Sequence, residues 1–126
     1  MIGVLFLACG RSAPPPVPVQ SAVVMVSLES VTAAGSATVM LTARSAWVLE
    51  RAECAIWQEG VMLDTVQIRS ELSLPPRQPV RLNLTFEELE PGPVQLTGSL
   101  HLAGLLGAQE LVLVELSGVA IQEGTP

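Results

Sequence analysis

The chain has no lysine and no tyrosine, and its only cations are six arginines scattered along 126 residues. The net charge is −6 at pH 7. A nucleic-acid-binding protein neutralises phosphates with a clustered basic surface, and this sequence contains no such cluster. The composition therefore disfavours binding to nucleic acid.

Long apolar runs are also missing, although 49% of the residues are hydrophobic and only 14% are charged. A transmembrane helix needs a run of ~18 or more apolar residues, and no segment approaches that length. The apolar residues are instead dispersed along the chain. Because a stretch of about 100 residues can bury roughly 60 to 70% of its unfolded surface, the sequence has room for one domain with a single core.

Side chains for catalysis or metal binding are few, since the sequence has one histidine, one aspartate and two cysteines. A zinc site or a nucleophilic triad needs several convergent partners, which these residues do not supply. Four carboxylates could offer oxygens to calcium, namely Asp64, Glu87, Glu88 and Glu90. They lack the spacing of a dedicated calcium loop, so we interpret them as solvated turn charges. We expect His101 on the surface, and no enzymatic activity, cofactor, metal or small-molecule substrate.

The first nine residues contain a short apolar run, Ile2–Ala8, that ends at Cys9. The run just meets the lower limit of a signal-peptide core, about 7 residues. Its end, Phe6-Leu7-Ala8-Cys9, resembles the lipobox of bacterial lipoproteins. The resemblance implies a signal peptide over residues 1–8 and a diacylglyceryl group on Cys9, which becomes the mature N-terminus. No Lys or Arg precedes the run, a departure that a start codon assigned too far downstream would explain. In the alternative interpretation, Met1–Ala8 is a first strand and Cys9 a buried thiol.

A proline-rich segment follows, with four prolines within positions 14–18. Such a segment cannot form a helix or a paired strand, and it favours polyproline II at ~3.1 Å per residue. Residues 9–20 are therefore predicted to be a lipidated cysteine and a tether that holds a domain roughly 30 Å from a bilayer. In lipoproteins an Asp after the lipidated Cys favours inner-membrane retention. Gly10 stands there instead, so the resemblance implies the periplasmic face of an outer membrane.

Three further residues need an account of their own. If Cys9 is acylated, no disulfide can form, and Cys54 is expected to be a small buried hydrophobe. Trp57 ends a predicted strand and is expected in the core. Trp47 follows a loop, and two interpretations stay open for it: a core position first, and an exposed anchor for a partner second.

From Gln20 onward apolar residues recur with a period of two, which is typical of half-buried strands. The clearest case is Val80–Phe86, in which alternate side chains are apolar. The other predicted strands cover residues 22–29, 36–44, 48–57, 61–68, 94–102 and 108–116. Residues 58–60 are predicted to form a hairpin turn, residues 72–79 a loop or blunted edge, and Leu89 could plug the end of the core. A helix over residues 105–116 is disfavoured because Gly107 and Gly118 bound the apolar run and no cap starts it.

About seven short strands without alternating helices predict an all-β, antiparallel, immunoglobulin-like two-sheet sandwich over residues 21–120, with a tail at 121–126. Four segments within residues 36–102 resemble the strand order of small immunoglobulin-like domains from bacterial cell-adhesion-related and late-embryogenesis-abundant proteins. They are Trp57–Val61, Leu74–Pro76, Val80–Phe86 and Leu89–Gly92. This resemblance bears on the fold and says little about function.

The combined features predict a non-catalytic, lipid-anchored module of a bacterial envelope, with the membrane as one partner through Cys9 and an envelope protein as the other. Recognition would use an edge strand or the loop ends. Two alternatives remain: a subunit of a secretion or surface-motility apparatus, and a soluble ligand-binding or enzymatic sandwich.

Overall fold

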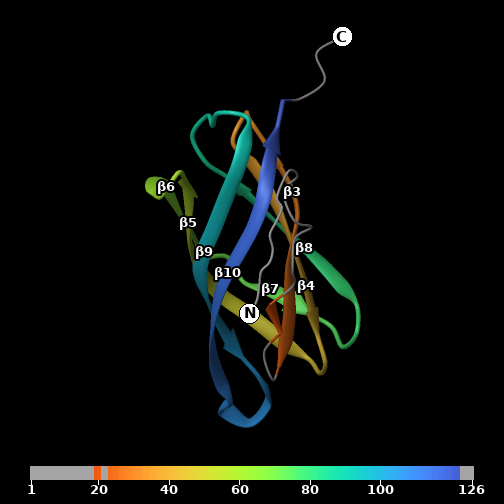
Figure 1. Cartoon of the computed structure of the whole chain (residues 1–126). Helices are drawn as coiled ribbons and strands as arrows, with labels where there is room; N and C mark the ends of the chain where they lie inside the picture. Colours follow the sequence, from red (N-terminus) through yellow and green to blue (C-terminus); the bar gives the residue numbers. More distant parts are fainter. Residues whose placement is uncertain (1–18, 21–22, 123–126) are drawn as a thin grey trace, which may run out of the picture.

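The computed structural model describes residues 19–20 and 23–122 (Figure 1). The predicted signal peptide, Cys9, the prolines of the tether and most of the predicted tail lie outside the described residues. No helix in the described part is long and apolar enough to cross a membrane.

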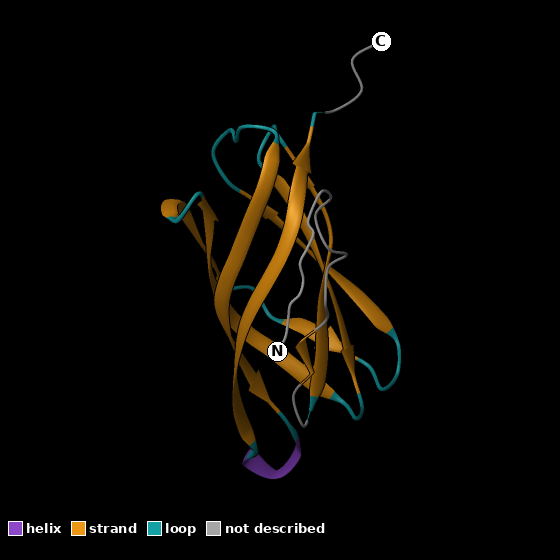
Figure 2. Ribbon diagram, viewed as in Figure 1, coloured by secondary structure: helices purple, strands orange, loops and turns teal. Residues whose placement is uncertain are grey.

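The fold is all-β, as predicted, and every strand predicted from the period of two is present among the described residues. These strands are β3 (Val24–Thr32), β4 (Ser36–Ala43), β5 (Trp47–Gln58), β6 (Val61–Ile68), β8 (Pro79–Thr85), β9 (Gly92–Ala103) and β10 (Gln109–Ile121). Two short strands, β2 (Val19–Gln20) and β7 (Leu72–Leu74), add to them. A 3-10 turn, η2 (Leu105–Gly107), joins β9 to β10 and is the short helical segment in Figure 2.

The described strands form one curled sheet in the order β6-β5-β9-β10-β3-β4-β8, with β2 beside β3 and β7 beside β5. Figure 1 shows how the sheet bends back so that β3, β4 and β8 lie across from β5 and β9. The predicted all-antiparallel pairing is wrong at one junction, because β10 runs parallel to β3, pairing Ala120 with Val31 and Ile121 with Thr32. The cause is the odd number of main strands. Because β3 and β10 are the first and the last of seven strands that alternate in direction, they run the same way. The result is a mixed sheet with a sandwich-like shape.

The two halves of the curled sheet share one hydrophobic core. Side chains from β3, β4 and β8 and from β5, β9 and β10 join a single buried cluster, and every buried side chain among the described residues is apolar. Leu89, in the loop after β8, closes one end of the core, where its exposed fraction is 5% and its backbone N–H donates to Ala33 O at 2.7 Å. The prediction that Leu89 plugs the core is confirmed.

Two irregularities shift the alternation of buried side chains within a strand. Register shifts occur at Glu29 in β3 and at Glu50 in β5. In β3 the buried positions change from even to odd numbers after Leu28, and in β5 they change from odd to even after Leu49. A bulge adds one residue and bends the strand. These bulges keep apolar side chains on the core face while the sheet curls.

A glycine sets the spacing between β5 and β9 at the middle of the sheet. Gly98 pairs with Cys54, and a Cβ at position 98 would lie 2.6 Å from Glu53 O and 3.0 Å from Cys54 Sγ. The nearer atom belongs to the backbone, which cannot move without shifting the strand. Position 98 therefore requires glycine because the strands approach closely there.

We predict that Gly98→Ala lowers the free energy of unfolding by about 2 kcal/mol, since the added methyl forces β5 and β9 apart. Urea unfolding followed by circular dichroism measures this change. Ser99→Ala, the neighbouring substitution on the outer side of β9, is the control and should change stability by less than about 0.5 kcal/mol. Equal stability of the two variants would contradict the close-approach explanation.

Candidate functional site

Strands β6, β5, β9 and β10 are consecutive in the sheet, and we call their outward side the outer face. Its central residues form cross-strand rows, which are Arg51, His101 and Leu111; Glu53, Ser99 and Leu113; Ala55, Thr97 and Glu115; and Trp57, Gln95 and Ser117. Away from the bulge at Glu50 and the start of β10, the side chains between these residues face the core. Because side chains alternate along a strand, the core packing fixes which residues the outer face presents.

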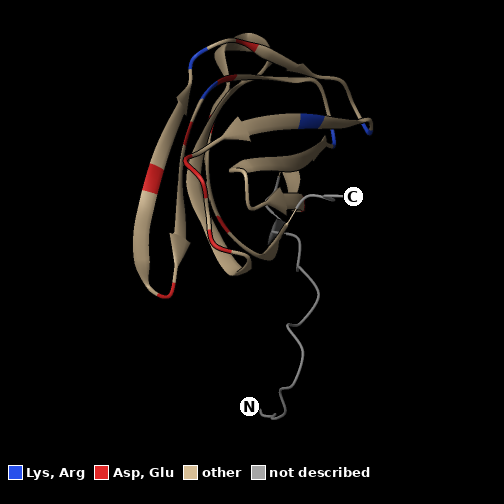
Figure 3. Cartoon of the chain, turned by 90° about the horizontal axis from the view of Figure 1, so that it is seen from above, with Lys and Arg blue, Asp and Glu red and all other residues tan. Residues whose placement is uncertain are grey.

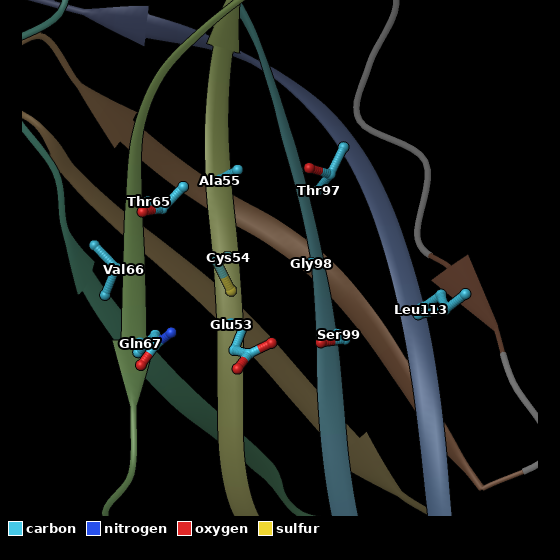
Figure 4. Close-up of a pocket in the computed structure, with 10 residues that line it drawn as sticks. All are labelled: Glu53, Cys54, Ala55, Thr65, Val66, Gln67, Thr97, Gly98, Ser99 and Leu113. Carbon is cyan, nitrogen blue, oxygen red and sulfur yellow. The ribbon is translucent and has the colours of Figure 1, made fainter.

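A shallow depression of about 440 Å³ lies in the middle of the outer face. Its floor combines three small side chains, Ala55, Thr97 and Ser99, with the carboxylate of Glu53 on β5, and Gly98 lies between Thr97 and Ser99. Figure 4 shows Leu113 on β10 at one side and Thr65 and Gln67 on β6 at the other. Small floor residues between larger rims make a groove that a partner side chain can enter.

Two hydrogen bonds order the polar side chains beside this groove. The Trp57 indole N–H donates to Thr97 Oγ1 at 2.9 Å, and the Gln95 amide donates to Glu115 Oε2 at 3.1 Å. The prediction that Trp57 belongs to the core is wrong, because its side chain lies half-buried on the outer face. Its position one residue after the buried Ile56 places it on the opposite side of β5.

Strand β10 contributes an apolar strip to the outer face. Leu111, Leu113 and Val119 point outward, with exposed fractions of 55%, 70% and 41%. Within the described residues β10 pairs with β3 only at Ala120 and Ile121. No further strand pairing on its edge away from β9 is described, but β2, which pairs with β3, also contacts β10 on this side. An edge strand next to exposed leucines is a surface to which another strand can add.

Trp47 begins β5, where it is half-buried and contacts the core cluster. A Cβ on Gly104 would lie 2.9 Å from the Trp47 ring, so the ring supports the end of β9. The indole nitrogen is buried and has no hydrogen-bond partner in the described part of the chain. This packing favours the core interpretation of Trp47, while its role as a partner anchor stays a prediction.

His101 and Asp64, two of the ionisable residues named in the sequence analysis, lie in different parts of the fold. His101 is half-buried on the outer face in a depression of about 460 Å³, which Glu50, Arg51 and Glu110 also line. Asp64 accepts hydrogen bonds from two backbone N–H groups, those of Thr65 at 2.8 Å and Glu87 at 2.9 Å. Asp64 thus fastens the loop after β8. The described residues contain no group of three or more side chains able to hold a metal ion.

Cys54 lies in the core with an exposed fraction of 5%, which confirms the prediction of a small buried hydrophobe. Burial raises the pKa of its thiol from 9.0 to about 11, because the thiolate would lose its hydration. Cys54 is therefore protonated at neutral pH and poorly reactive.

No family model and no curated protein matches this chain. Among solved structures, an X-ray structure of a Northeast Structural Genomics Consortium target aligns with a TM-score of 0.54 at 14% identity, over 86% of this chain and 83% of that one. The crystal structure of a protein from Archaeoglobus fulgidus aligns with a TM-score of 0.41 at 11% identity, over 82% of this chain and 98% of that one. The first likeness indicates a shared fold, and such low identity carries no information about function.

We predict that the free energy of unfolding falls by about 2 kcal/mol as the pH rises from 9 to 11. Below pH 9 the folded and unfolded states both keep the Cys54 proton, whereas above it only the folded state does, so alkali favours unfolding. The chain has no lysine or tyrosine to titrate in this window. Urea unfolding across this range measures the change.

The Cys54→Ala variant supplies the control for this alkaline effect. It should be less stable than the parent at pH 8 but should lose the decline above pH 9. The same decline in both proteins would show that the thiol is not its source.

Proposed function

We propose that this protein is a non-catalytic, lipid-anchored module of a bacterial envelope that binds a protein partner through the outer face and the adjoining edge of β10. The observation that carries the proposal is the apolar strip of β10, where Leu111 and Leu113 are exposed on the outer face beside the groove. A partner that covered these two side chains would remove them from water.

The edge of β10 lacks three of the features that usually prevent strand addition. Natural edge strands are protected by proline, lysine or bulges. Residues 109–119 contain neither proline nor lysine, and their pairing with β9 runs without a register shift. An extended segment of a partner could therefore extend the sheet through backbone hydrogen bonds, while the groove beside Leu113 selects its side chains.

An immunoglobulin-like description of the fold forms part of the proposal. The order β3-β4-β8 on one side and β10-β9-β5-β6 on the other supports it, as does the contact between the first and last long strands. In such sandwiches the strand edges and the loops at the ends are the usual places for recognition. The proposed partner surface includes one of these edges.

The anchor is proposed from the sequence around Cys9. A diacylglyceryl group supplies two chains, and each buried methylene contributes about 0.8 kcal/mol, enough for stable attachment to a leaflet. The proline-rich tether would then let the domain reach up to roughly 30 Å from the bilayer, and Gly10 after the cysteine favours the periplasmic face of an outer membrane. Attachment concentrates the module at the surface where its envelope partner lies.

We expect the protein expressed in a Gram-negative bacterium to incorporate radiolabelled palmitate, because Cys9 would be the acylated residue. Labelling of the immunoprecipitated protein measures it. Cys9→Ser should abolish the label, and Cys54→Ser, which alters the buried cysteine, should keep it. A label that persists in Cys9→Ser, or no label in the parent, would contradict the anchor.

We predict that Leu113→Glu lowers affinity for the protein partner tenfold or more, because burying a leucine contributes about 1.5 to 3 kcal/mol and a carboxylate would resist desolvation. In-cell photo-cross-linking from position 99, which pairs with Leu113 on the outer face, captures the partner, and the yield with and without Leu113→Glu measures the loss. The matched control is Val61→Glu, at an exposed apolar residue of β6. A partner yield that depends on Val61 and not on the β10 leucines would overturn this assignment.

A further inference from the structure

The turn between β9 and β10 ends in two exposed leucines. Leu105 and Leu106 have exposed fractions of 79% and 104%, higher than those of the other exposed large hydrophobic residues of the described chain. No charged residue occurs from Leu102 to Gln109. The tip of this hairpin can therefore enter an apolar medium without burying a charge.

The backbone holds these leucines in a defined and unfavourable conformation. Leu106 has φ of +57°, a left-handed conformation that glycine adopts without steric cost and leucine does not. The turn is closed by hydrogen bonds from Gly104 N to Ala108 O at 2.8 Å and from Ala108 N to Leu105 O at 3.1 Å. The Trp47 ring packs against Gly104 at its base. The tip is thus a firmly supported apolar projection.

The loops at the two ends of the domain differ in charge. Figure 3 marks the arginines in blue and the acidic residues in red, in a view from above in which the two ends overlap. The loops that share an end with the tip, residues 44–46 and 75–78, carry the exposed Arg44 and Arg77 and no carboxylate. At the opposite end, the connections after β5 and β8 carry four exposed glutamates and no arginine: Glu59, Glu87, Glu88 and Glu90. Glu110, the second residue of β10, is the carboxylate nearest to the tip in the sequence, and Arg44 and Arg77 outnumber it. The opposite end carries glutamates without arginine, so the end with the leucine tip is the one that complements an anionic surface.

We infer that the end formed by the β9–β10 tip docks on an anionic lipid bilayer, with Leu105 and Leu106 in the interface and Arg44 and Arg77 on headgroup phosphates. Apolar insertion combined with attraction to anionic lipids is how peripheral proteins bind bilayers. The opposite end also exposes apolar side chains, at Val61 and Met62, but Glu59 and the loop glutamates would repel the same surface. This contact adds to the proposed acyl anchor and does not require it.

The test uses the full-length chain carrying Cys9→Ser and Leu106→Cys, labelled at position 106 with an environment-sensitive nitrobenzoxadiazole dye. The buried Cys54 thiol, whose pKa burial raises to about 11, escapes labelling. Vesicles of phosphatidylcholine and phosphatidylglycerol should raise the emission severalfold and shift it to the blue. Vesicles of phosphatidylcholine alone should do so less, and the same dye at Glu59→Cys should stay in water.

Two sets of variants distinguish docking through the tip end from nonspecific adsorption of the protein to vesicles. Arg44→Gln and Arg77→Gln should each weaken lipid binding about fivefold, whereas Arg69→Gln, outside these loops, should not. Leu105→Ser should weaken it about tenfold, and Val61→Ser should leave it unchanged. A dye at position 106 that stays in water at every lipid concentration, or responds no more than the dye at position 59, would overturn the inference. Because Cys9 is already serine, failure of the palmitate experiment leaves this result unaffected.

Discussion

The strands of this protein each bury one face against a single shared core, and this shared burial forces the sheet to curl. Leucine, valine and isoleucine side chains from both halves enter the same cluster, with no polar side chain buried among the described residues. A flat sheet would leave one face of every strand in water. The bulges at Glu29 and Glu50 allow the strands to bend while their apolar side chains stay inward.

The curl of the sheet determines which side chains lie on its outer face. Because the inward side chains are fixed by the core, their neighbours in β5, β9 and β10 make up the outer face, and the register of these strands sets its rows. Gly98 brings β5 and β9 close together, and the small residues beside it form the floor of the groove. The leucines of β10 then stand beside this floor. The surface that we propose for a partner is therefore set by the same packing that stabilises the core.

The alternating direction of the strands also sorts the loops into two ends. The connections that carry Arg44 and Arg77 lie at one end with the leucine tip, and the glutamate-rich connections lie at the other. Neighbouring loops at one end come from distant parts of the sequence, so the net charge of −6 conceals this separation. The two ends can therefore face different surroundings, one an anionic bilayer and the other water.

The sequence by itself determined the all-β class, the seven main strands, the burial of Cys54 and the closure of the core by Leu89, because each depends on a local period of two or a local turn. Only the tertiary structure decided which strands are neighbours. The parallel contact of β10 with β3, the place of Trp57 on the outer face and the groove beside Leu113 all depend on pairing between residues far apart in the chain. Periodicity shows which side chains share a face of one strand, but register and curvature decide what that face meets.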